Sequence, residues 1–139
     1  MAPSPQKFRE IVFQLLFSCD FAPVDDDLSS FIMQEHQITK KVFYLALEEK
    51  QRIEEKKEEI DKIIAKSSQM YAFDRIPATE RNLLRLGIYE LLYAPQLPQK
   101  VVISEAMRLA RKFATAEASN FINALLDGVK NELSAGQTT

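Results

Sequence analysis

The sequence predicts an all-α fold, and two observations carry that prediction. Among 139 residues there are only three glycines and six prolines, too few for the many tight turns of a β-sandwich or barrel. The charged stretch from Glu48 to Lys66 contains neither glycine nor proline, as expected of continuous helix. With 46% hydrophobic residues, the chain has enough apolar surface for a packed core, which excludes global disorder.

Four helices are expected in the first half. Residues 5–19 begin with Ser4 as a capping hydroxyl and Pro5 where no amide donor is needed. Apolar residues then recur at helical spacing: Phe8, Ile11, Val12, Leu15, Leu16 and Cys19. After the Asp25–Asp27 run, residues 28–37 form a short helix. Residues 38–69 are too long for one globular helix, so we expect a break near Glu49–Lys50.

Three helices are expected in the second half, which gives about seven in all. Residues 80–93 follow Pro77, with Thr79 as the expected cap, and are apolar on nearly all sides, which predicts a central buried helix. Pro95 and Pro98 end this helix, and residues 101–113 form the next. A last helix spans residues 117–133, with its apolar stripe on one side.

Composition excludes several classes of function. The net charge of −2 rules out a broadly basic surface, so any binding of nucleic acid must use a local patch. Cys19 is the single cysteine and His36 the single histidine, and no glycine-rich phosphate loop is present. We therefore expect no catalytic residue, metal or cofactor. No apolar run approaches a membrane span or signal peptide, so a cytoplasmic protein with no membrane contact is expected.

One face of the first helix carries chemistry that a core does not explain. At about 100° per residue, Phe17 falls opposite the core stripe, with Phe13 near it. The same outward face carries Gln6, Glu10 and Gln14, flanked by Lys7 and Arg9. An exposed ring beside donors and cations suits a splayed single-stranded base. The alternative is that Phe13 and Phe17 fill a second core or a homodimer interface.

Two weaker signals lie near the C-terminus. Phe121 sits to one side of the last helix's apolar stripe, where it is either a surface ring or a core-edge ring. On the preceding helix, Arg108, Arg111 and Lys112 lie at i, i+3 and i+4 and form a small basic strip. Such strips are most often simply solvated.

Several separated motifs follow one another along the chain. They are YAFDRIPATERNLLRLGIYEL from Tyr71, PQKVVISEA from Pro98, LARKF from Leu109, FINALLD from Phe121, and Arg9-Glu10 with QLLF from Gln14. In this order they resemble the NusB family of bacterial transcription antitermination factors. The resemblance covers nearly the whole chain and is loosest over residues 22–68.

The resemblance implies a fold and a function. The fold is a single domain, residues 1–139, of two three-helix bundles sharing a core, with the N-terminal bundle over residues 4–69 and the C-terminal bundle over residues 70–135. The function is binding of the boxA element in ribosomal-operon leader RNA, as a heterodimer with ribosomal protein S10 (NusE). Together they join an RNA polymerase antitermination complex.

The resemblance also implies where the contacts lie. The family's RNA surface matches Lys7, Arg9, Phe17, Lys100, Glu117 and Phe121, to which the helix pattern adds Gln6 and Gln14. The family's acidic positions facing S10 match Asp74 and Glu80. The family's arginine-rich start has only two cations here, Lys7 and Arg9, Phe17 stands for a tyrosine, and Tyr71 stands for a tryptophan. Fewer cations predict fewer phosphate contacts and a stronger dependence on S10.

Two other functions stay open from the sequence. One is an accessory RNA-binding domain of a system that modifies ribosomal RNA, against which the missing methyl-donor loop counts. The other is a self-associating helical module, in which Phe13 and Phe17 are buried in a homodimer. Sizing by light scattering, with and without RNA, distinguishes this module from an RNA-binding adaptor.

Overall fold

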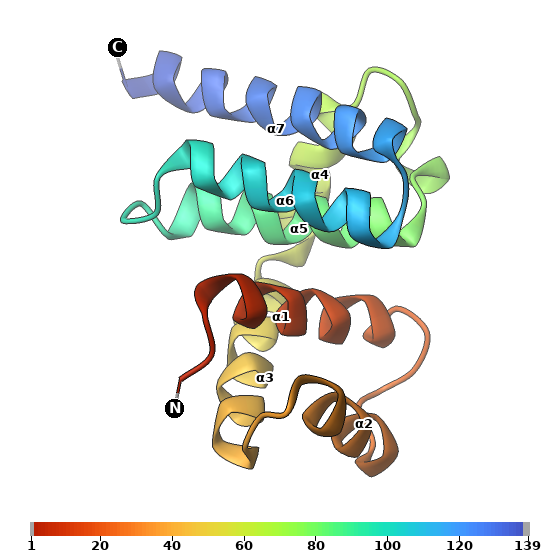
Figure 1. The fold of residues 1–139 in the computed structure, drawn as a ribbon. Helices are drawn as coiled ribbons and strands as arrows, with labels where there is room; N and C mark the ends of the chain where they lie inside the picture. Colours follow the sequence, from red (N-terminus) through yellow and green to blue (C-terminus); the bar gives the residue numbers. More distant parts are fainter. Residues whose placement is uncertain (1, 138–139) are drawn as a thin grey trace. The chain divides into compact units, whose positions relative to one another are not determined.

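The computed structural model describes residues 2–137, which form seven α-helices and one short 3-10 helix (Figure 1). Over these residues no strand is present, and the predicted all-α class is confirmed. The helices fall into two compact units, a first unit up to Glu55 and a second unit from Lys56.

The first unit contains α1 (Pro5–Cys19), α2 (Asp26–His36) and α3 (Lys40–Glu55). α1 has the predicted bounds, because the Ser4 hydroxyl accepts the Lys7 amide at 3.2 Å and Pro5 occupies the first turn. α1 packs on α2 and α3. The apolar side chains buried on these helices include Ile11, Leu15, Ile32, Phe43, Ala46 and Ile53.

The ends of α2 are set by single residues. The Asp25 carboxylate accepts the Leu28 amide at 2.8 Å, so α2 begins two residues before the predicted start. Gln37 ends α2 in the left-handed conformation, with φ of 52°. Residues 38 and 39 are therefore not helical, and the Thr39 hydroxyl accepts the Val42 amide at 3.2 Å in the first turn of α3.

The break between α3 and α4 (Lys57–Ser67) falls at Lys56, and the expected break near Glu49–Lys50 is wrong. α3 continues through Lys50 because this side chain is buried and its ammonium pairs with Glu54 one turn further on, at 2.9 Å. α4 packs on α5 and α7 in the second unit. This differs from the predicted boundary near residue 69, which assigned the same segment to an N-terminal bundle.

The second unit adds η1 (Phe73–Arg75), α5 (Ala78–Tyr93), α6 (Gln99–Phe113) and α7 (Ala116–Gln137) to α4. α5 contacts α4, α6 and α7, and residues 82–88 are all buried, so the predicted central helix is confirmed (Figure 1). Gly87 allows α7 to approach closely, since a Cβ there would lie 2.9 Å from Leu126 Cδ1.

Polar contacts tie α4 to α5. Arg85 is 5% exposed, and its Nε and Nη2 donate to the two carboxylate oxygens of Asp61 at 2.8 and 2.9 Å. At the far end of α5, the Tyr93 hydroxyl donates to Glu59 at 2.7 Å. The Lys56 ammonium lies 5.3 Å from the centre of the Tyr93 ring. The start and middle of α4 are thus both held against α5.

Candidate functional site

The cations on the polar face of α1 are less exposed to solvent than predicted. Gln6 is exposed and Lys7 is half-buried, as a contact surface requires. Arg9, expected to flank this face, is only 8% exposed. Position 9 lies between Phe13 and Leu16 on the helix surface and shares their burial. Among the described residues at the start of α1, Lys7 is therefore the one cation that remains partly exposed to solvent.

Gln14 and Glu10 on this face meet His36 at the end of α2. The His36 Nε2 lies 2.7 Å from the Gln14 side-chain oxygen and donates to it, while Nδ1 lies 3.9 Å from a Glu10 carboxylate oxygen. The Gln14 oxygen, predicted to face RNA, is thus used in holding α2 against α1. The periodicity of α1 could not reveal this contact, because His36 lies 22 residues further along the chain.

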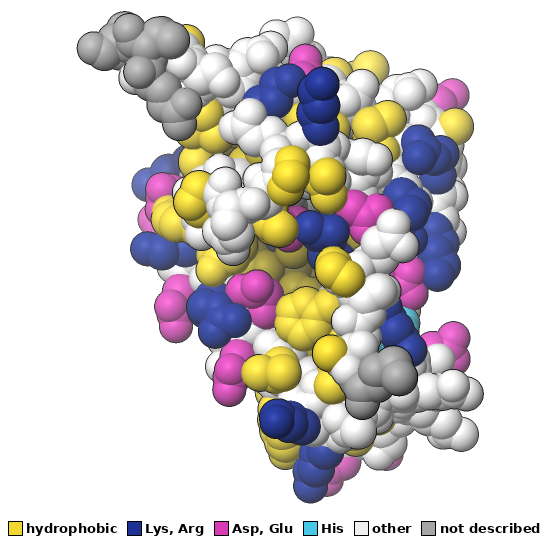
Figure 2. Space-filling model, turned by 60° about the vertical axis from the view of Figure 1, so that its left-hand side comes forward, with side chains coloured by type: hydrophobic (Ala, Val, Ile, Leu, Met, Phe, Trp, Pro, Cys, Tyr) yellow, Lys and Arg dark blue, Asp and Glu magenta, His cyan; other side chains and the backbone are white. Residues whose placement is uncertain are grey.

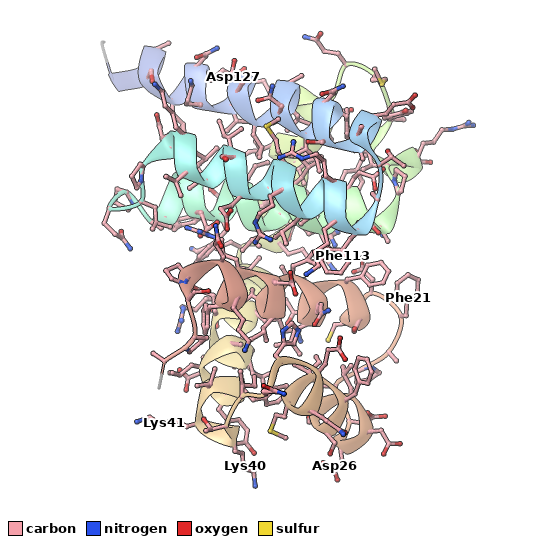
Figure 3. The ribbon with its side chains drawn as sticks, in the orientation of Figure 1. Phe21, Asp26, Lys40, Lys41, Phe113 and Asp127 are labelled. Carbon is pink, nitrogen blue, oxygen red and sulfur yellow. The ribbon has the colours of Figure 1, made fainter. Side chains whose placement is uncertain are left out.

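Three phenylalanines follow one another along α1 and the turn after it. Phe13 is buried at 3% exposed, contrary to its expected place near the outward face. Phe17 is half-buried, with ring centres 6.1 Å from Phe13 and 5.2 Å from Phe21. Phe21 is 70% exposed and is labelled beyond the end of α1 in Figure 3. Phe17 thus links a buried ring to an exposed one, and part of its surface stays open for stacking.

The second unit contains a groove of about 700 Å³. It brings together three residues that the sequence assigned to two different ligands: Glu80, Glu117 and Phe121. Its walls come from the end of α4, the loop before η1, the first turn of α5 and α7 as far as Glu132. The Lys and Glu side chains that line it are Lys66, Glu80, Glu117 and Glu132, so the groove is acidic.

The aromatic wall of this groove is Tyr71 rather than Phe121. Phe121 is 9% exposed and its ring lies edge-on to Tyr71, with centres 5.2 Å apart. Tyr71 is 43% exposed and the adjacent Met70 is 69% exposed. Ser68 fixes this loop, because its hydroxyl donates to the Tyr71 carbonyl and accepts from the Tyr71 amide. Phe121 therefore supports Tyr71 from beneath, which answers the open choice between surface ring and core-edge ring.

Glu80 is the most perturbed carboxylate of the groove. It lies in the first turn of α5 and is half-buried, and this burial raises the pKa of its carboxyl above the ordinary value. Glu117 is exposed in the first turn of α7. A carboxylate at a helix N-terminus beside an aromatic wall suits a cationic group.

Lys100 and Asp74 lie apart from the groove lining. Lys100 is exposed in the first turn of α6, and Asp74 is exposed in η1. No set of three or more His, Cys, Asp or Glu side chains within residues 2–137 is arranged to hold a metal ion. The described surface thus offers contact chemistry in two regions, the polar face of α1 and the groove with its surroundings.

The family of the chain follows from a match to a family model over residues 6–131, which is described as the NusB family. The chain belongs to the NusB family.

Relatives of the family match over nearly the whole chain. The transcription antitermination protein NusB of Chlamydia pneumoniae is 35% identical over 96% of this chain and 84% of its own length. That of Koribacter versatilis is 34% identical over 94% of this chain and 90% of its own.

Solved structures of the family share the fold. NusB of T. maritima has a TM-score of 0.78 and 30% identity, covering 95% of this chain and 94% of its own. A structure of the antitermination factors NusB and NusE in complex with dsRNA has a TM-score of 0.76 and 27% identity, covering 91% of this chain and 96% of that one.

Two residues of this NusB-family chain were missed as contributors to the site. Tyr71 was noted only for standing in place of a tryptophan, although its ring forms the open aromatic wall. Met70 gave no signal at all, because a single apolar residue in a loop has no periodicity.

Among residues 2–137, the helices are all too short or too polar to cross a membrane.

Proposed function

We propose that the chain is a transcription antitermination factor that binds boxA-type RNA of ribosomal-operon leaders together with ribosomal protein S10 (NusE). In this role it joins an RNA polymerase antitermination complex and acts by binding, without catalysis. The observation that carries the proposal is the match to NusB antitermination proteins along nearly the whole chain. The related structure that contains NusB, NusE and dsRNA supports the two kinds of partner.

The exposed candidates divide into two contact sets. For RNA we assign Gln6, Lys7, Phe17, Lys100 and Glu117, which all have accessible surface. Arg9, Gln14 and Phe121 act as supports for this surface, since two are buried and the third is bonded to His36. For S10 we assign Asp74 and Glu80, whose charge suits a basic ribosomal protein.

The proposed function predicts that S10 raises RNA affinity. The chain has a net charge of −2 and a half-buried Lys7 and a buried Arg9 at the start of α1, so its own electrostatic attraction for RNA is small. A coupling free energy of about 1–3 kcal/mol, typical of linked sites, corresponds to a gain of about 5- to 150-fold. The measurement is affinity for a boxA-type RNA with and without S10, at one fixed salt concentration.

An RNA with a scrambled boxA is the control for sequence preference. Equal affinity for boxA RNA in the presence and absence of S10 would contradict the coupling. A chain that self-associates and binds neither RNA nor S10 would instead favour the self-associating module.

A further inference from the structure

The groove of the second unit extends along one face of α7. The α7 residues that line this face recur at helical spacing: Glu117, Phe121, Ala124, Leu125, Gly128 and Glu132. From Glu117 to Glu132 the helix rises by about 22 Å, so the groove is elongated. Residues 66–71, at the end of α4 and in the loop after it, supply most of the remaining lining. A groove of this length accommodates about six or seven residues of extended chain.

Gly128 lies on this face and has no packing reason within the chain to be a glycine. A Cβ at this position would meet no described atom within 4 Å, whereas a Cβ at Gly87 would lie 2.9 Å from Leu126. Its φ is not positive, so the backbone does not require glycine either. A glycine inside a helix costs stability relative to alanine. What Gly128 provides is a low floor in the groove, over which the backbone of a partner can approach closely.

The charge of the groove selects the kind of partner. Its lining has three glutamates and one lysine, together with the Tyr71 ring, which is 43% exposed, and Met70, which is 69% exposed. Carboxylates beside an aromatic ring suit ammonium and guanidinium groups. Phosphates of RNA would be repelled by this lining. A second copy of the chain, with its net charge of −2, would bring no excess of cations.

We propose that this groove binds an extended, basic segment of S10, with the backbone of the segment over Gly128, its cations on Glu80 and Glu132, and a Lys or Arg side chain on the Tyr71 ring. The inference rests on the proposed function, which assigns only Asp74 and Glu80 to S10. It adds Tyr71, Gly128 and Glu132 as contacts. Glu117, an RNA candidate, lines the same groove, so the bound segment would lie next to the RNA.

The first test fills the groove in the full chain without disturbing the chain's own packing. Gly128→Leu introduces a side chain where a Cβ has open space. Asn131→Leu is the matched control, because Asn131 is exposed on the same helix and lies outside the groove lining. Calorimetric titration measures affinity for S10, a second titration measures the affinity of the chain for boxA RNA with S10 present, and thermal melts check folding.

We expect Gly128→Leu to weaken S10 binding by about 5- to 150-fold, because the leucine side chain occupies the space of the bound segment. Asn131→Leu should bind S10 as the parent chain does. Both variants should melt at or above the temperature of the parent chain, since leucine is a better helix former than glycine or asparagine.

The second test changes the charge and the ring. Glu132→Gln removes one proposed contact with S10. Asp127→Asn is its control, because Asp127, labelled on α7 in Figure 3, lies outside the groove lining and pairs with Lys130 at 3.1 Å. Glu132→Gln should slow association with S10 and flatten its dependence on salt more than Asp127→Asn does. Tyr71→Leu should weaken S10 binding by about 2- to 5-fold through loss of the ring.

Three results would overturn the inference and leave the proposed function standing, each in a parent chain that binds S10 and boxA RNA. In the first, Gly128→Leu and Glu132→Gln bind S10 as the parent chain does. In the second, they keep S10 and lose RNA, which would assign the groove to RNA. In the third, Gly128→Leu dissociates a dimer of the parent chain and keeps S10, which would assign the groove to a second copy. Failure of the parent chain to bind S10 would remove the proposed function and this inference together.

Discussion

The two units of the chain differ in charge and in the kind of contact they offer. Residues 1–55 carry ten acidic and six basic side chains, whereas residues 56–139 carry ten acidic and twelve basic ones. The first unit presents the rings of Phe17 and Phe21 with little positive charge beside them. The second unit presents exposed cations at both ends of α6. The half-buried Phe17 ring, which is assigned to RNA, thus lies in one unit, and most accessible positive charge lies in the other.

Within the second unit, acidic and basic side chains gather at different places. The groove beside Tyr71 is lined by three carboxylates and one lysine, while the last turn of α6 contains the basic residues Arg111 and Lys112. On the face drawn in Figure 2, by contrast, basic and acidic side chains are interspersed. A local excess of carboxylates therefore distinguishes the groove from a mixed surface. This division suits one protein partner and one RNA partner.

The largest expected effect compares the stability contributed by a buried ion pair in the second unit with that of an exposed ion pair in the first. Arg85→Ala should destabilise the chain by about 3–5 kcal/mol, because it leaves Asp61 without its bidentate partner in a largely buried place. Arg52→Ala is the control in the first unit, since Arg52 pairs with Glu49 at 3.0 Å but is 52% exposed. That change should cost about 0.2–1 kcal/mol.

Urea unfolding followed by circular dichroism measures both variants. Equal losses of unfolding free energy would show that burial does not distinguish these ion pairs. Retention of the slope against urea would indicate that each substitution changes stability rather than the extent of unfolding.

The next effect compares the candidate rings of the two units. Phe121→Ala should cost about 3–5 kcal/mol of folding free energy, since the ring is 9% exposed and packs beneath Tyr71. Phe17→Ala should cost about 1–3 kcal/mol of RNA binding and less stability, because the Phe17 ring is only half-buried. Thermal melts and boxA affinity per folded molecule distinguish the two. A Phe121→Ala chain that melts normally and loses RNA would restore this ring as a direct contact.

The sequence predicted α1 and the central α5 well, because each has a strong local signal. Ser4 and Pro5 begin α1 by backbone chemistry alone, and the leucines of α5 leave no polar side for solvent. The break at Lys56 was misplaced because the charged residues around it favour helix on both sides. Its position depends on Lys50 and Glu54 pairing within α3 and on Tyr93 contacting Lys56 from α5. The contact between Tyr93 and Lys56 joins residues far apart in the chain, so no local window of sequence reveals it.

The candidate site was predictable as a set of residues but not as a surface. Periodicity correctly placed Gln6 and Phe17 away from the core stripe of α1, yet it missed that Arg9 is buried and that Gln14 bonds to His36. The Gln14 contact depends on a side chain from another helix, α2. The groove likewise arises only because the loop containing Tyr71 folds over α7, about 50 residues later in the chain. The family motifs pointed to residues of α5 and α7 without indicating that these residues line one groove.

The smallest expected effect concerns Glu80, the carboxylate that the groove of the second unit holds at a raised pKa. Burial raises this pKa above its unfolded value, so the folded chain binds the proton more tightly. The stability contributed by Glu80 is therefore highest when it is protonated, and is lost as pH rises from the unfolded pKa through the folded one. Glu80→Gln should be more stable than the parent chain above this window. The difference should shrink as pH falls below it.

S10 binding should depend on Glu80 in the opposite sense. Only the ionised carboxylate attracts a basic partner, so Glu80→Gln should slow association and flatten its salt dependence at neutral pH. Asp74→Asn is the matched comparison, since Asp74 is the other carboxylate assigned to S10 but is exposed and lies outside the groove lining. It should slow association less than Glu80→Gln does. Calorimetric unfolding across the acidic range, together with association rates at two salt concentrations, measures both effects. If Glu80→Gln gains stability yet binds S10 at the parent rate, the acidic groove does not attract S10 through Glu80.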